Sequence, residues 1–118
     1  MIKIKRLFKS FKYAFRGLFK IWREEQNLQT QSILGLIVVL LGWYFKIQAW
    51  QWVILVLVIG LVILMEIINS AIERIVDALK PRIDNYVKEI KDIMAAAVML
   101  ASILAIIIGL IIFLPYLG

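Results

Sequence analysis

Four polar side chains lie on one face of a predicted helix in an otherwise apolar stretch of the chain. They are Glu66, Asn69, Glu73 and Asp77. Because each helical residue turns by about 100°, spacings of three, four and four confine all four side chains to an arc of about 80°. Carboxylates near membrane depth are costly unless they face a protein interior, a cavity or an ion. We therefore interpret this face as a functional site in a membrane protein.

These residue types are suited to a Mg²⁺-nucleotide site. Glu25 adds a further carboxylate, and Lys91 and Asp92 open the last apolar segment. Mg²⁺ takes oxygen ligands and binds through one or two carboxylates plus substrate phosphates. A cation would neutralise a transferring phosphoryl group, and a carboxylate would take the proton of an acceptor hydroxyl. From the spacing alone, a catalytic site, an ion or proton pathway in a small transporter, and structural pairing between helices all stay open.

The residues that are missing narrow the chemistry. The chain has no cysteine and no histidine, which removes disulfides, thiolate nucleophiles, the usual zinc sites and imidazole acid-base catalysis. Any general base must therefore be a carboxylate. The common nucleotide motifs GxxxxGK[ST] and HRD are also absent from the sequence, so an ordinary soluble kinase is excluded.

Long uncharged runs predict the elements that carry this site. The chain has 118 residues, 64% of them apolar, and a spanning helix needs about 20 residues. We expect a single all-α membrane domain over residues 1–118, with spans at 28–46, 50–79 and 88–114 and Pro115 ending the last. The 50–79 helix is too long for the hydrocarbon, so its last turns should project beyond it. Residues 5–24 alternate apolar and basic positions at helical spacing, which predicts an amphipathic surface helix.

The cations are distributed unevenly about these spans. All lysines and arginines except Lys46 lie before Glu24 or between Arg74 and Lys91. This positive-inside pattern places the N-terminus and the 74–92 connection in the cytoplasm. It also explains the net charge of +6 without nucleic acid, which we do not expect as a partner. Three spans bury few faces, so we expect a homo-oligomer.

The run EIINSAIERIVD from Glu66 to Asp77, followed by Lys91 and Asp92, strongly resembles the prokaryotic diacylglycerol kinase family, which includes the undecaprenol kinases. The resemblance covers nearly the whole chain. It implies a homotrimer of the bacterial cytoplasmic membrane, with active sites shared between chains, that transfers the γ-phosphoryl group of ATP to a lipid alcohol. The segment SFKYAFRGL from Ser10 to Leu18 looks more like the Gram-positive branch, whose members favour undecaprenol over diacylglycerol.

The resemblance also implies a role for each matching residue. Glu66 would be the general base that takes the lipid hydroxyl proton, and Asn69 would orient substrate or phosphate. Glu25 and Glu73 look like the Mg²⁺ ligands. The residues that fall where the family contacts nucleotide are Arg6, Tyr13, Asp77, Lys91 and Asp92, with Lys91 as the γ-phosphate cation. Adenine contacts are expected from residues 81–86, while Gln29 stands where a basic residue is often found.

A different class of function stays open beside this one. The same carboxylates would serve a catalytically silent scaffold, or a small ion-coupled transporter in which they carry cations. The two hypotheses differ in which residues must accompany Glu66 in the site, because a transporter has no need of Glu25, Lys91 and Asp92 at the same cytoplasmic level.

Overall fold

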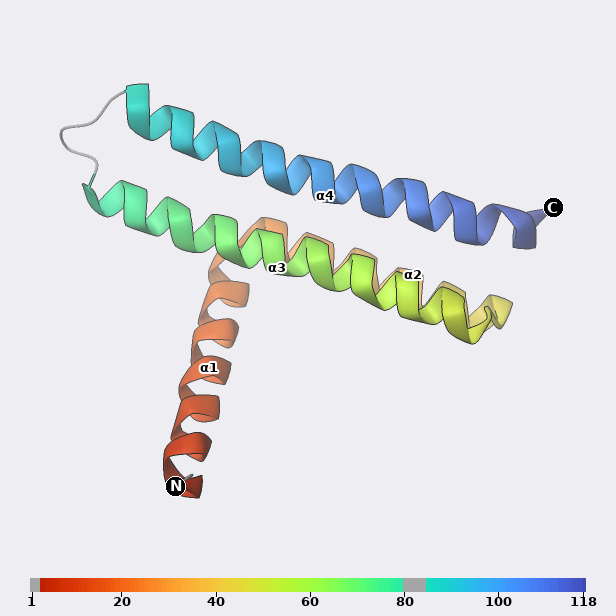
Figure 1. The fold of residues 1–118 in the computed structure, drawn as a ribbon, viewed down its shortest axis with the longest axis horizontal. Helices are drawn as coiled ribbons and strands as arrows, with labels where there is room; N and C mark the ends of the chain where they lie inside the picture. Colours follow the sequence, from red (N-terminus) through yellow and green to blue (C-terminus); the bar gives the residue numbers. More distant parts are fainter. Residues whose placement is uncertain (1–2, 80–84) are drawn as a thin grey trace.

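The computed structural model describes residues 3–79 and 85–118, and within these ranges it contains helices and no strand. The helices are α1 (Ile4–Glu24), α2 (Gln26–Phe45), α3 (Ala49–Leu79) and α4 (Asn85–Leu117). Figure 1 shows α2, α3 and α4 as long rods that run in alternating directions, with α1 leaving them at a steep angle. α3 is the central helix and packs against both α2 and α4. The expected all-α class, with an N-terminal helix followed by three apolar helices, is confirmed.

The central helix α3 buries a regular stripe of its surface. From Gln51 to Ser70 its buried side chains recur at every third or fourth position, and the next one follows six residues later; they are Gln51, Leu55, Val58, Val62, Glu66, Ser70 and Val76. This is the periodicity of one helix face packed against neighbours. Glu66 continues an otherwise mostly apolar stripe, and its carboxylate therefore faces the protein rather than the lipid.

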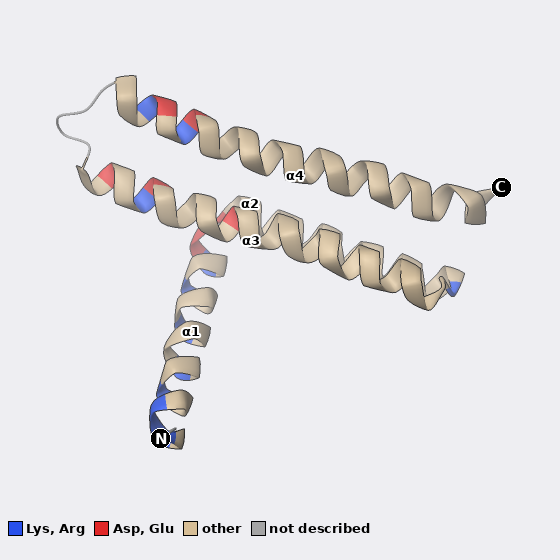
Figure 2. Cartoon of the chain, in the orientation of Figure 1, with Lys and Arg blue, Asp and Glu red and all other residues tan. Residues whose placement is uncertain are grey.

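The three later helices carry the membrane character of the chain. α2, α3 and α4 are each long and apolar enough to cross a membrane, yet only 11%, 28% and 11% of their most apolar windows are buried. Figure 2 shows most of the charged residues on α1 and on the ends of α3 and α4 nearest their connection, with one acidic position farther along α3 and one basic position where α2 meets α3. Residues 80–84, where most of the expected adenine contacts fall, lie outside the described residues.

A single extended residue separates α1 from α2. Glu25 adopts φ −110° and ψ 110°, and its N–H still donates to Ile21 O at 2.9 Å. Gln29 Nε2 donates to the carbonyls of Trp22 at 2.8 Å and Arg23 at 3.3 Å. Gln29 thus caps the end of α1, whose last carbonyls have no partner within the helix. The change of chain direction at Glu25 brings the Glu25 carboxylate to α3.

A buried amide connects the α2–α3 turn to the C-terminal end of α4. Gln51 Oε1 accepts hydrogen bonds from the Gln48 N–H at 2.9 Å and from the Tyr116 hydroxyl at 2.7 Å. The prediction that Pro115 ends the last helix was wrong, because α4 continues to Leu117. A proline this close to the terminus removes only one backbone hydrogen bond. The added turn carries Tyr116 to Gln51.

Close packing at Gly42 gives a test of this end of the fold. A Cβ at Gly42 would lie 2.9 Å from Trp52 Cη2 and 3.1 Å from Ile47 Cδ1. We expect Gly42→Val to lower the free energy of unfolding by about 1–3 kcal/mol, because the added methyl groups overpack the α2–α3 turn. Thermal unfolding in detergent checks this. Gly60→Val is the matched control, because no atom lies within 4 Å of a Cβ there; equal losses in the two variants would contradict the packing argument.

Candidate active site

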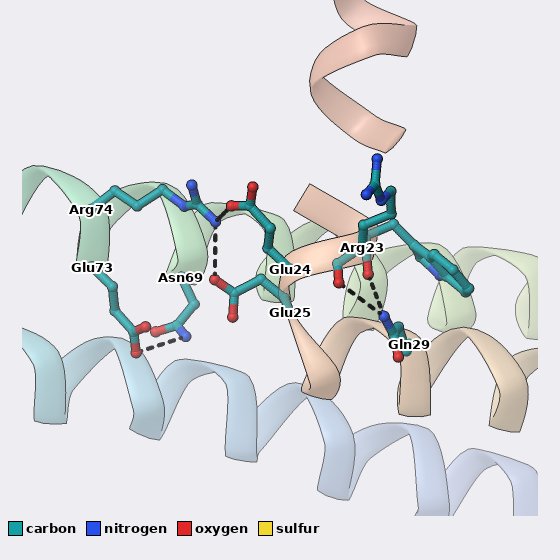
Figure 3. A network of polar contacts seen from close by, with 8 residues as sticks. Arg23, Glu24, Glu25, Gln29, Asn69, Glu73 and Arg74 are labelled. Atoms are coloured by element: carbon teal, nitrogen blue, oxygen red, sulfur yellow. Dashed lines mark hydrogen bonds and ion pairs between the residues drawn. The ribbon is translucent and has the colours of Figure 1, made fainter. Parts of the chain in front are cut away.

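The core of the site is a short polar segment of α3. Glu66 is only 4% exposed, and Asn69 and Glu73 are half-buried. Asn69 Nδ2 donates to Glu73 Oε1 at 3.3 Å, and Figure 3 shows the amide and the carboxylate turned toward each other. Asn69 Oδ1 is buried with no hydrogen-bond partner among the described residues. A buried acceptor of this kind is costly to leave unpaired, so it indicates a missing donor or cation.

Glu25 joins this segment from the break between α1 and α2. Figure 3 places Glu24 and Glu25 beside the stretch of α3 that carries Asn69, Glu73 and Arg74. The carboxylates of Glu25 and Glu73 both act electrostatically on Glu66. The structure therefore brings together the predicted base, its orienting amide and both predicted metal ligands.

An ion pair connects α3 to α4 at the next turns. Lys91 Nζ lies 2.6 Å from Asp77 Oδ1, and both side chains are partly exposed. The Glu73 carboxylate also acts electrostatically on Lys91, in agreement with a position of Lys91 close to the acidic face of α3. Asp92 follows Lys91 and is exposed at the same end of α4. Lys91, predicted to bind the γ-phosphate, is thus ion-paired with the Asp77 carboxylate.

The two predicted nucleotide residues of α1 lie apart from this cluster. Arg6 and Tyr13 are exposed on α1, whose N-terminal end points away from α3 and α4 in Figure 1. The Tyr13 ring is covered instead by the Arg16 guanidinium, 5.6 Å from its centroid. One chain by itself does not bring these two residues to the other site residues.

Arg74 and Glu24 are residues that the sequence reasoning did not place in the site. Arg74 Nη2 donates to Glu24 Oε1 at 2.8 Å and to Glu25 Oε1 at 3.4 Å. The hydrogen bond from Arg74 lowers the pKa of Glu24 below its usual value. The pairing is therefore complete above the ordinary pKa of a glutamate and is lost as the pH falls through the lowered one. A sequence signal existed, since the helical spacing puts Arg74 beside the acidic face, but its partner lies fifty residues away.

The donor set suits Mg²⁺ better than a fully protein-bound metal. No group of three or more acidic side chains in residues 3–79 and 85–118 is arranged to hold a metal ion. Mg²⁺ does not need such a group, because it binds through one or two carboxylates and takes its other ligands from phosphates and water. Glu25 and Glu73 supply two carboxylates, and the unpaired Asn69 Oδ1 adds a buried oxygen acceptor beside Glu73. The residues present fit the ion.

Comparison with known proteins decides the family. The family model described as prokaryotic diacylglycerol kinase matches residues 12–113. The chain belongs to this family. It is 36% identical to an undecaprenol kinase of Bacillus subtilis over 113 residues, which cover 96% of this chain and 92% of the relative. It is 31% identical to a diacylglycerol kinase of Escherichia coli strain K12, over 86% of this chain and 84% of the relative.

A diacylglycerol kinase of Helicobacter pylori is 34% identical over 84% of this chain and 77% of that relative. Membership in the prokaryotic diacylglycerol kinase family makes this protein a lipid kinase with membrane helices, and a kinase uses a nucleotide co-substrate. The matched range includes every predicted site residue except Arg6.

Proposed function

We propose that this protein transfers the γ-phosphoryl group of ATP to the hydroxyl of a membrane lipid alcohol, with undecaprenol as the favoured acceptor and diacylglycerol as the alternative. The observation that carries the proposal is Glu66, a carboxylate only 4% exposed within an apolar helix, with Asn69 and Glu73 on the same face. A buried carboxylate within an apolar helix suits the hydroxyl of a lipid better than the hydroxyl of a water-soluble alcohol.

In the proposed reaction Glu66 is the general base. The lipid hydroxyl oxygen attacks the γ-phosphorus of ATP, and its proton passes to the Glu66 carboxylate. The bond between the γ-phosphorus and the β–γ bridging oxygen breaks in line, which releases ADP and leaves the lipid phosphate. Asn69 orients the substrate or the phosphate near the base, and its amide N–H is the donor available to a phosphoryl oxygen.

Glu25 and Glu73 would hold Mg²⁺ against the phosphates. The ion, when bound, neutralises charge on the β- and γ-phosphates. The protein's part is to present two carboxylates from separate segments of the chain, because Glu25 comes from the α1–α2 break and Glu73 from α3.

The nucleotide would be held by the charged ends of α3 and α4 and by a neighbouring chain. Lys91 exchanges Asp77 for the γ-phosphate, and Asp77 and Asp92 then contact the remainder of the nucleotide. Arg6 and Tyr13 would come from the adjacent subunit of a homotrimer, since one chain does not bring them to the site. The sparse burial of α2 and α4 supports such an assembly. The cation distribution supports a cytoplasmic N-terminus.

The acceptor is inferred from the N-terminal segment and from the relatives. The Ser10–Leu18 segment resembles the Gram-positive branch, and the Bacillus subtilis undecaprenol kinase shares more identities over more of this chain than the Escherichia coli diacylglycerol kinase does. We expect faster phosphorylation of undecaprenol than of diacylglycerol when each is offered at equal mole fraction in mixed micelles with Mg²⁺ and ATP. The ratio of kcat/KM values measures this preference. A higher value for diacylglycerol would reverse the assignment of the acceptor.

A silent scaffold or transporter is distinguished by nucleotide binding. A ligand that binds only the folded state raises the free energy of unfolding, by about 2.7 kcal/mol at a hundred times its Kd. We therefore expect ATP with Mg²⁺ to raise the unfolding temperature of the detergent-solubilised protein, and ATP with EDTA to raise it less. No shift in either condition would favour the non-enzymatic alternative.

A further inference from the structure

Arg74 connects the surface helix to the centre of the bundle. Its Nη2 donates to Glu24 Oε1 at 2.8 Å and to Glu25 Oε1 at 3.4 Å, across sequence separations of 50 and 49 residues. Figure 3 shows the guanidinium of α3 facing both carboxylates at the end of α1. One cation therefore bridges two neighbouring glutamates, of which only Glu25 is expected to bind metal.

The two contacts of Arg74 are unequal. Charge-assisted N–H···O bonds are about 2.7–2.9 Å long, so the Glu24 contact is a full hydrogen bond, whereas the 3.4 Å Glu25 contact is mainly electrostatic. A metal ion that takes Glu25 would displace only the weaker contact. Arg74 would keep its hydrogen bond to Glu24 when the metal ion binds.

Glu25 needs an outside contact to fix its side chain. It is the one extended residue between α1 and α2 in the described chain, so the regular geometry of neither helix sets its direction. Its backbone N–H bonds Ile21 O, which holds the main chain but leaves the carboxylate free. Among the described residues, the contact recorded for that carboxylate is the one with Arg74.

We propose that Arg74 is a positioning residue that, anchored on Glu24, holds the Glu25 carboxylate toward Asn69 and Glu73 in readiness for a divalent cation. The inference rests on the proposed function, because it takes Glu25 as a metal ligand. It also predicts the direction in which the loss of Arg74 changes the affinity for Mg²⁺. Removal of a nearby positive charge by itself would strengthen Mg²⁺ binding, whereas loss of a positioning contact weakens it.

A Mg²⁺ titration separates these two effects. The unfolding temperature is recorded in detergent with a saturating, non-hydrolysable ATP analogue as Mg²⁺ is added. We expect Arg74→Gln and Glu24→Gln each to raise the Mg²⁺ midpoint about fivefold, as for the loss of a contact that orients a metal ligand. Arg74→Lys keeps the positive charge but loses the planar guanidinium with its paired N–H donors, and it should raise the Mg²⁺ midpoint less.

Arg23→Gln is the matched control, because it removes a positive charge near the same break without touching the bridge; its guanidinium lies over Phe19 instead. Its Mg²⁺ midpoint should stay at the native value. An unchanged or lower midpoint in Arg74→Gln would overturn the proposal, and so would a rise in Arg23→Gln equal to that in Arg74→Gln.

A second measurement needs neither metal nor nucleotide. Amide hydrogen exchange at the α1–α2 break should be faster in Arg74→Gln and Glu24→Gln than in the native chain. Equal exchange in all three proteins would overturn the bridge itself. If Mg²⁺ does not change the unfolding temperature of the native chain, the proposed function is overturned instead. Failure of the Arg74 bridge and failure of the proposed function are therefore distinguishable.

Discussion

Glu66→Gln is expected to remove phosphoryl transfer while leaving nucleotide binding intact. The amide keeps the shape of the side chain but cannot accept the proton of the lipid hydroxyl, and general-base catalysis contributes about 10²–10⁴-fold. The loss should appear in kcat, measured with undecaprenol in mixed micelles, and the KM for ATP should change little. Because Glu66 is buried in α3, replacing the carboxylate by a neutral amide should also leave the protein at least as resistant to heat.

The control for this variant is Gln51→Glu, which places a carboxylate on the same buried stripe of α3 at the opposite end of the helix. It should not restore activity when combined with Glu66→Gln, because the proton acceptor must lie near Asn69 and Glu73. Native kcat in Glu66→Gln would remove Glu66 from the reaction and, with it, the observation on which the proposed function rests.

Lys91→Met should give the second large effect. The variant removes the cation proposed to neutralise the γ-phosphate, and the loss of one such stabilising group costs about 10²–10³ in kcat. It also removes the positive charge that lies 2.6 Å from Asp77, so a weaker affinity for ATP is expected from the more negative surface. Steady-state kinetics with varied ATP measures both effects.

Lys88→Met is the matched control for Lys91. Lys88 lies one turn earlier on α4 and is exposed, and it carries the same charge at the same end of the helix. A general electrostatic role of this surface would make the two variants equally impaired. The specific role assigned to Lys91 requires that Lys88→Met keep nearly native kcat.

The sequence predicted the architecture well because hydrophobic periodicity and length determine membrane helices. The buried stripe on α3 includes Glu66, and Asn69 and Glu73, which the same helical spacing placed on its face, are half-buried. Local chemistry at helix ends was less predictable. Pro115 was predicted to end the last helix, but a proline near a helix terminus costs only one hydrogen bond, and the added turn brings Tyr116 to Gln51.

The contacts that the sequence could not give are those between distant segments. Arg74 meets Glu24 and Glu25 only because a single extended residue redirects the chain between α1 and α2. Lys91 and Asp77 were both predicted as nucleotide contacts, but their mutual ion pair depends on how α3 and α4 pack. Among the described residues of one chain, Arg6 and Tyr13 lie apart from the other site residues, so their assignment to the nucleotide depends on a neighbouring subunit.

The most direct test of the central claim follows the fate of the γ-phosphate. Purified protein is incubated in mixed micelles with Mg²⁺, undecaprenol and ATP labelled at the γ-phosphorus, and the label is then separated among lipid, protein, inorganic phosphate and ATP. In-line transfer from ATP to the lipid hydroxyl predicts label in the lipid phosphate and none on the protein. Label that stays in ATP both with undecaprenol and when diacylglycerol replaces it would contradict in-line transfer to the lipid. Label that accumulates on the protein would contradict it as well.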